Sequence, residues 1–139
     1  MGKINLTVLT PDRVLISGLE ADSLVLPAYG GELGVLPGHA PLVAQLKEGI
    51  LKYKSGGKEE FLSVFWGFAY IEKDKAVILT EMAEMLKEIS EERARQEYQR
   101  AKDAINMKGA DLDLDSAQAS LKKAVVRMKL AEIRKNKNI

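Results

Sequence analysis

Hydrophobic and polar residues alternate along the first part of the chain. Ile4, Leu6 and Val8 alternate with Asn5 and Thr7, the period of two that is expected of a strand with one buried face. Short apolar runs separated by turn residues follow at residues 14–16, 23–26, 42–46, 50–54, 60–66, 68–72 and 76–79. Short strands at regular spacing predict an antiparallel β-sandwich or barrel over about residues 1–82.

Glycines mark two special positions in this predicted β-domain. Ser55-Gly56-Gly57-Lys58 predicts a hairpin turn that needs positive φ angles. Gly67 lies between Trp66 and Phe68, which predicts either a β-bulge or a close approach of one sheet to another.

The hydrophobic period changes after Glu81. Met82, Met85, Leu86 and Ile89 begin a helical spacing, and Ser90 is a predicted N-cap. Two apolar faces follow, made by Ala94, Tyr98, Ala101 and Ile105 and then by Ala117, Leu121, Ala124, Val125 and Met128. We therefore expect an α+β fold, with a β-domain at residues 1–86 followed by an antiparallel two-helix hairpin at residues 87–139.

The ends of the two predicted helices have their own signals. Gly109 is a plausible stop for the first helix. Asp115 and Gln118 form a capping box at the start of the second, with Leu114 as the preceding apolar residue. The facing stripes are rich in alanine, so each contact contributes about 1 kcal/mol or less, and the connector at residues 106–114 is long. Such a hairpin can open, although a static hairpin that covers one end of the sandwich fits the pattern equally well.

One segment of the β-domain is unusually rich in glycine and proline. Residues 30–42 contain four glycines, two prolines and the only histidine of the chain. This composition predicts a short strand at residues 33–36 between two sharply shaped loops. Glu32 and His39 are expected in turns, facing outward on an exposed rim.

Composition and charge narrow the class of protein. The chain has 139 residues, 46% of them hydrophobic, and no cysteine, which is enough apolar material for a core and excludes disulfides and thiol chemistry. No apolar run reaches the roughly 20 residues of a membrane-spanning helix. The net charge is +1, but residues 121–139 contain seven cations and one acid. That segment is either a solvated helix terminus or a basic arm for an acidic partner.

Catalytic chemistry is not indicated. One histidine without cysteine cannot build a zinc site of the usual ligands, and no Walker or dinucleotide-binding motif occurs. Gly56-Gly57-Lys58 resembles a phosphate loop only superficially, because no helix follows. We expect no enzyme activity, no metal and no required cofactor.

Three segments resemble the epsilon subunit of bacterial-type F-type ATP synthases. Residues 31–49 read GELGVLPGHAPLVAQLKEG, residues 67–71 with 77–81 match further along, and residues 115–119 match near the C-terminus. The resemblance implies a non-catalytic rotor subunit of the central stalk, with a coupling sandwich and a regulatory hairpin. It implies a place at the cytoplasmic face of the cell membrane, bound only through the complex, and no nucleic-acid partner.

The resemblance also assigns partners to particular residues. Glu32 aligns with the contact to the loops of the c-ring, and His39 with the gamma side of the rotor. When the hairpin extends, a basic face would meet the catalytic beta and alpha subunits and oppose ATP hydrolysis; its residues are Lys122, Lys123, Arg127 and Lys129.

Some bacterial members of this family bind regulatory ATP on the hairpin through Ile or Leu, Asp, two variable residues, Arg and Ala. Here Ile89, Arg93 and Ala94 match, but Ser90 replaces the aspartate. Cations stand at three further positions of that site, at Arg100, Lys123 and Arg127, with Lys123 where arginine is expected. The resemblance therefore implies weakened ATP binding, and the alternative is that Arg93 simply pairs with Glu97 four residues later.

Two other functions fit the pattern less well. The chain could be a stand-alone β-sandwich binding module whose hairpin oligomerises. It could also bind nucleic acid through its basic last helix, but aromatic stacking residues are missing beside the basic run.

Overall fold

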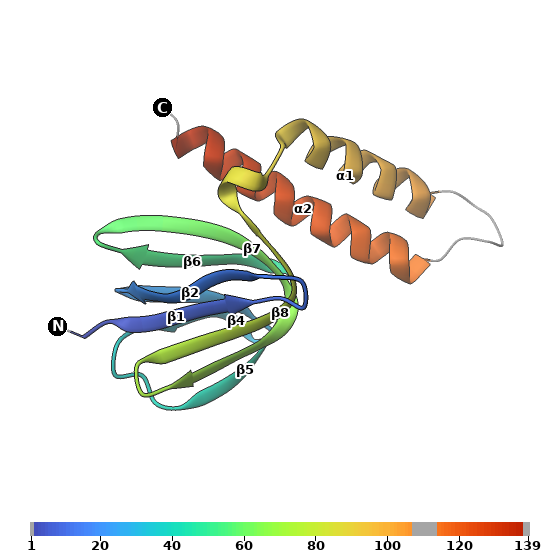
Figure 1. Ribbon diagram of the computed structural model, residues 1–139. Helices are drawn as coiled ribbons and strands as arrows, with labels where there is room; N and C mark the ends of the chain where they lie inside the picture. Colours follow the sequence, from blue (N-terminus) through green and yellow to red (C-terminus); the bar gives the residue numbers. More distant parts are fainter. Residues whose placement is uncertain (1, 107–113, 138–139) are drawn as a thin grey trace. The chain divides into compact units, whose positions relative to one another are not determined.

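The computed structural model describes residues 2–106 and 114–137. It divides into two compact units, Met1–Met85 and Leu86–Ile139, coloured from blue to yellow-green and from yellow to red in Figure 1. The first is a β-sandwich and the second a pair of packed helices. The predicted α+β fold is thus confirmed.

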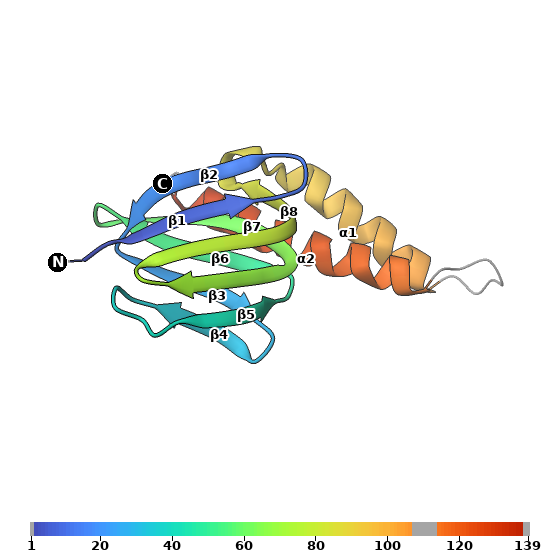
Figure 2. The ribbon, with the colours of Figure 1, turned by 60° about the horizontal axis from the view of Figure 1, so that its bottom comes forward.

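Eight strands make up the sandwich within residues 2–85, the described part of the first unit. They are β1 (Ile4–Leu9), β2 (Val14–Ala21), β3 (Ser23–Ala28), β4 (Gly31–Val35), β5 (Leu42–Leu46), β6 (Gly49–Ser55), β7 (Lys58–Glu72) and β8 (Lys75–Met85). Their order is β2-β1-β8-β7-β5-β3-β4, with β6 paired to β3 and β7 (Figure 2). The expectation of wholly antiparallel pairing is wrong at one place, because β1 and β8 run parallel. β1 and β8 lie far apart in the chain and are not joined by a hairpin turn, so the local sequence pattern does not indicate their relative direction.

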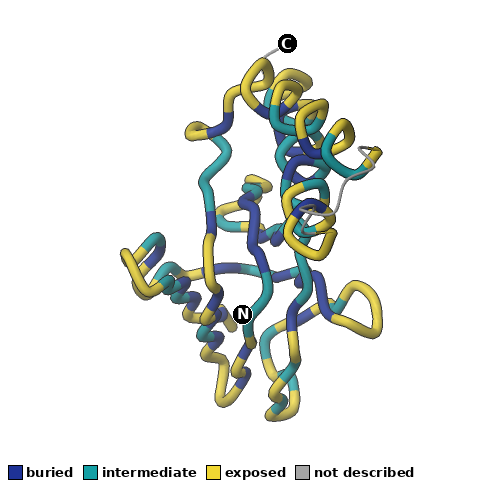
Figure 3. The backbone as a smooth tube through the Cα atoms, turned by 90° about the vertical axis from the view of Figure 1, so that its right-hand side faces the viewer, coloured by how far each residue is buried: buried dark blue, intermediate teal, exposed yellow. Residues whose placement is uncertain are grey.

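The core lies between the two layers of the sandwich. Buried and exposed positions alternate along its strands, as Figure 3 shows. The largest buried side chains of this core are all apolar and include Ile4, Leu6, Val8, Leu24, Leu26, Leu46, Leu51, Leu62 and Ile78. Each such side chain stabilises the fold by roughly 1.5–3 kcal/mol relative to exposure. All members of this core cluster belong to the first unit.

Strand β7 changes direction at Trp66 and Gly67. Its first half pairs with β6 and its second half with β5, and the two residues at the change have φ angles of 59° and 137°. A Cβ atom at Gly67 would lie 2.0 Å from the carbonyl oxygen of Leu79. The register with β8 does not shift across this point. The predicted close approach therefore exists, but it joins the neighbouring strands β7 and β8 of one sheet, and the pairing of these two described strands has no bulge at Gly67.

Thr80 completes this close approach. Its hydroxyl accepts a hydrogen bond from the backbone N–H of Phe65 at 3.1 Å and lies 2.6 Å from the carbonyl oxygen of Trp66. Thr80 is only 4% exposed, so these bonds satisfy a polar side chain that would otherwise destabilise the core.

The second unit contains a short 3₁₀ helix, η1 (Leu86–Glu88), and the helices α1 (Glu91–Asn106) and α2 (Leu114–Lys137). The helical spacing expected from Met82 onward is wrong, because Met82 and Met85 belong to β8 and pair with Phe65 and Leu62 of β7. Strand pairing outweighs the local period there. The backbone N–H of Arg93 donates to the hydroxyl of Ser90 at 3.3 Å, which confirms the predicted N-cap.

Alanines form the seam between α1 and α2. The buried ones are Ala94, Ala101, Ala117, Ala124 and Ala131. Asp115 already lies inside α2, so the predicted capping box does not precede the helix. Gly109 and residues 107–113 of the predicted connector lie outside the described residues.

Candidate functional site: a rim, an apolar face and a cationic groove

The glycine-rich segment forms an exposed rim of the sandwich. Among the strands that the structure describes, β4 pairs only with β3 and is therefore an edge strand. Glu32 is exposed, as expected, but it lies in β4 opposite Pro27 and not in a turn. The expectation of a turn is wrong because β4 begins at Gly31, two residues earlier than the apolar residues alone suggest.

The loop after β4 is held in a defined shape. The backbone N–H of His39 donates to the carbonyl oxygen of Leu36 at 3.1 Å, and its Nδ1 lies 2.7 Å from the carbonyl oxygen of Ala40. The N–H of Gly38 donates to the carboxylate of Asp74 at 2.6 Å. His39 is half-buried. The rim thus presents Glu32 and His39 from a strand and an ordered loop that is attached to the β7–β8 turn.

An apolar surface that was not predicted from the sequence covers the outward side of β5, β7 and β8. Phe68 faces outward between Gln45 of β5 and Leu79 of β8. Two residues further along β7, Tyr70 lies between Val43 of β5 and Val77 of β8, which forms a second row of residues across the three strands. Val43, Phe68, Tyr70 and Leu79 are 61, 45, 43 and 40% exposed. We call this set, with the half-buried Val77, the apolar outer face.

The apolar outer face continues into a cavity of about 580 Å³. Its lining comes from strands and a turn of the sandwich, at Leu9, Thr10, Pro11, Gln45, Leu46, Trp66, Gly67, Phe68, Leu79, Thr80 and Glu81. A solvated sheet face is normally polar at its outward positions. Large contiguous apolar surfaces on proteins are typical of sites that bind another macromolecule or a ligand.

A signal for this face was present in the sequence. Residues 68–71 read Phe-Ala-Tyr-Ile and residues 76–79 read Ala-Val-Ile-Leu, so both faces of each strand are apolar. Such runs suggest strands buried on both sides. In the structure only one side is buried, since Ala69, Ile71, Ala76 and Ile78 face the core.

The helical unit carries a second candidate site between α1 and α2. The structure brings together the predicted cations Arg93, Arg100, Lys123 and Arg127 around a cavity of about 520 Å³. The remaining lining is Glu97, Ala101, Ala104, Ala117 and Ser120. We call this the cationic groove. Ile89 and Ala94 are buried and are not among the lining residues of the groove.

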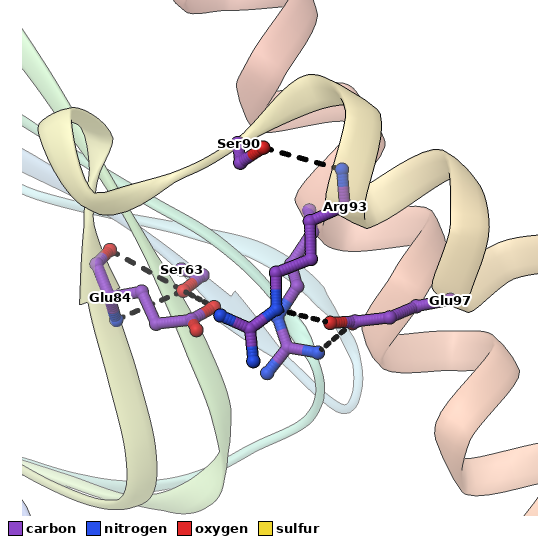
Figure 4. A network of polar contacts seen from close by, with 6 residues as sticks. Ser63, Glu84, Ser90, Arg93 and Glu97 are labelled. Carbon is purple, nitrogen blue, oxygen red and sulfur yellow. Dashed lines mark hydrogen bonds and ion pairs between the residues drawn. The ribbon is translucent and has the colours of Figure 1, made fainter.

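One carboxylate bridges two of these cations. Glu97 Oε2 accepts a hydrogen bond from Arg127 Nη1 at 2.6 Å, and its Oε1 lies 3.3 Å from Arg93 Nε. Figure 4 shows Glu97 and Arg93 turned toward each other below the Ser90 cap. The predicted pairing of Arg93 with Glu97 is therefore present, and it extends across to α2.

The predicted basic face divides into two. Successive helical residues are about 100° apart, which places Lys122 and Lys129 on one side of α2 and Lys123 with Arg127 on another. Lys123 and Arg127 line the cationic groove. Lys129 lines a separate cavity of about 670 Å³ between the helices, together with Arg95, Tyr98 and Glu132.

The described residues offer neither a metal site nor a membrane-spanning helix. Within residues 2–106 and 114–137, no cluster of three or more His, Cys, Asp or Glu side chains could hold a metal ion. Across the same residues, no helix has the length and apolarity to cross a bilayer. The Lys3 ammonium lowers the pKa of Asp22 through a hydrogen bond, and burial raises the pKa of Tyr53; neither group lines the cavities described above.

Both units of the chain match models of one known protein family. The family model described as ATP synthase, Delta/Epsilon chain, beta-sandwich domain matches residues 3–86. The model of the long alpha-helix domain of the same chain matches residues 87–132.

The sequence similarity to individual relatives extends over nearly the whole chain. The ATP synthase epsilon chain of Desulforamulus reducens is 42% identical over 127 residues, which cover 91% of this chain and 96% of that one. That of Moorella thermoacetica is 39% identical, with 94% and 98% covered. A chain in the mitochondrial ATP synthase of Euglena gracilis, solved with OSCP, F1 and the c-ring, shares the fold with a TM-score of 0.82 at 24% identity, covering 96% of this chain and 82% of that one.

Proposed function

Because this chain belongs to the ATP synthase delta/epsilon family, as an epsilon subunit of the F-type central stalk, we propose that residues 1–86 couple gamma to the c-ring and residues 87–139 regulate hydrolysis. The subunit is non-catalytic. It must therefore act through surfaces that bind other subunits. The observation that best supports this proposal is the apolar outer face.

The apolar outer face is proposed to bind the gamma subunit. Its four exposed members and Val77 form two rows across three neighbouring strands. Burying such a surface contributes about 25 cal/mol per Å² of apolar area. Phenylalanine and tyrosine, here Phe68 and Tyr70, are enriched at interface cores, and tyrosine is also enriched among the residues that contribute most binding energy. A rotating stalk needs a contact of this kind, because torque is transmitted only while the subunits stay together.

The rim is proposed to bind the c-ring. Glu32 on the edge strand is assigned to the polar loops of the ring, and His39 to the gamma side of the rotor. The bond from Gly38 to Asp74 holds the loop, so little ordering entropy is lost when the ring binds. These contacts would place the subunit peripherally at the cytoplasmic face of the cell membrane.

The hairpin is proposed to change between a compact form and a form extended toward the catalytic beta and alpha subunits. Its seam consists mainly of alanines, which bury little area and can be exchanged for contacts elsewhere. In the extended form, Lys122 and Lys129 on one side of α2 and Lys123 and Arg127 on another are available to acidic surfaces.

Deletion of residues 88–139 is expected to increase ATP hydrolysis by the assembled complex severalfold while proton-coupled synthesis continues. The sandwich core draws on the first unit alone, so the truncated chain should still fold and bind gamma. Hydrolysis and synthesis are measured on vesicles reconstituted with either form. Unchanged hydrolysis would contradict an inhibitory hairpin.

The cationic groove is proposed to bind ATP as a regulatory ligand. Four cations line it, and arginine can hold a phosphate through two parallel hydrogen bonds. Ser90 caps the helix through its hydroxyl but supplies no carboxylate, and Lys123 offers a point charge where a guanidinium would grip in two places. We therefore expect weak binding.

Equilibrium dialysis of the full chain against labelled ATP should show saturable binding below millimolar nucleotide. Arg100→Gln should weaken it by about fivefold or more, because a charge-assisted bond to phosphate is lost. Arg95→Gln is the matched control, since Arg95 lines the other cavity of the hairpin. Equal effects of both variants, or no saturable binding, would refute the site.

A further inference from the structure

We propose that Glu97 is an internal competitor for the anionic ligand of the cationic groove and thereby sets its affinity. The inference rests on the proposed nucleotide site. It assigns to Glu97, which is not one of the matching positions of the ATP pattern, the role of an affinity-determining residue.

The geometry of Glu97 is that of a bound anion. Its two oxygens contact two different arginines, one on each helix: Oε2 is 2.6 Å from Arg127 Nη1 and Oε1 is 3.3 Å from Arg93 Nε. A phosphate group bound in the groove would use the same donors in the same way. The carboxylate thus occupies the position of at least one phosphate oxygen.

Burial makes the competition effective. The side chains of Arg127 and Glu97 are 18% and 29% exposed, so their attraction is screened less than that of a surface pair. Arg93 is 81% exposed and contributes less. The pair also joins residues 30 positions apart, so the same carboxylate links α1 to α2 when no ligand is present.

A polyphosphate can replace this link. It carries several anionic oxygens and can contact Arg93 and Arg127 together with Arg100 and Lys123, which line the same cavity. It must first displace the Glu97 carboxylate, which also repels it. Glu97 therefore lowers the affinity of the groove, and its carboxylate links the two helices when polyphosphate is absent.

The test compares Glu97→Gln with the full wild-type chain, titrated calorimetrically with ATP and separately with inorganic tripolyphosphate. Glutamine keeps an oxygen that can accept from Arg127 but loses the charge. Both ligands should bind the variant about tenfold or more tightly than the wild type, since a competing charged pair and a repulsion are removed. Circular dichroism before each titration verifies that the helices are intact.

Glu91→Gln is a closely matched control. Glu91 also lies on α1 and pairs with the arginine four residues later, Arg95, at 2.9 Å, but it lines the other cavity. The charge change is identical, so any general electrostatic gain appears in both variants. Affinity within about twofold of wild type is expected for Glu91→Gln.

The outcomes separate the two proposals. Saturable binding by the wild type, with no gain in Glu97→Gln beyond that of Glu91→Gln, overturns the role of Glu97 and leaves the nucleotide site standing. Binding by Glu97→Gln alone supports Glu97 as a competitor strong enough to mask the site. Absence of binding by wild type and both variants, with intact helices, overturns the nucleotide site and this inference together.

Discussion

Replacing Phe68 by Asp is expected to lower the affinity of the chain for the gamma subunit by about a hundredfold or more. Phe68 lies in the middle of the apolar outer face, flanked by Gln45 and Leu79 on the neighbouring strands. A carboxylate buried there against an apolar partner has no cation to compensate its desolvation. Affinity is measured by surface-immobilised gamma with the free chain in solution.

Two controls test whether the loss depends on the charge and on its position in the apolar outer face. Phe68→Leu keeps the apolar surface and should retain affinity within a few-fold. Leu114→Asp places the same charge at a residue that is 45% exposed, the same fraction as Phe68, but lies in the hairpin, and it should leave gamma binding unchanged. If Phe68→Asp binds as tightly as Leu114→Asp, the apolar outer face is not the contact with gamma.

Gly67→Ala is expected to lower the free energy of unfolding of the sandwich by about 3 kcal/mol or more. The new Cβ would lie 2.0 Å from the carbonyl oxygen of Leu79 and 2.7 Å from the Cα of Thr80. Both atoms belong to the backbone, so neither can move without disturbing the pairing of β7 with β8. The φ of 137° adds strain for any residue with a Cβ. Urea unfolding followed by Trp66 fluorescence measures the loss.

Gly34→Ala is the control for this substitution. Gly34 also lies in a strand, but a Cβ there would have no heavy atom within 4 Å, and the expected change is within about 1 kcal/mol. A similar small loss at Gly67 would show that the strands can separate at the kink without cost.

The pattern of residues predicted the fold well where the signal is local. Alternation from Ile4 to Val8, the Gly56-Gly57 turn with its positive φ angles and the Ser90 cap each depend on a few neighbouring residues. The parallel pairing of β1 with β8 and the extension of β8 to Met85 depend on partners many residues away. No local period reports such pairing, so those features were missed or assigned wrongly.

The candidate sites likewise divide into features that the sequence predicted and features that depend on the folded structure. The rim and the cations of the hairpin were identified through family resemblance, and Arg93 with Glu97 through the i,i+4 spacing. The contact of Glu97 with Arg127 needs the folded hairpin to become visible. The apolar outer face needs the strand order, because only the pairing of β5, β7 and β8 brings Val43, Phe68 and Leu79 onto one surface.

Hydroxyl-radical footprinting of the chain, alone and assembled with gamma and the c-ring, tests whether the apolar outer face is buried against another subunit. It measures the solvent exposure of individual side chains, and aromatic ones react readily. Phe68 and Tyr70, exposed by 45% and 43% in the isolated chain, are expected to become strongly protected in the assembly. Oxidation of both residues at the same rate in the two states would contradict it.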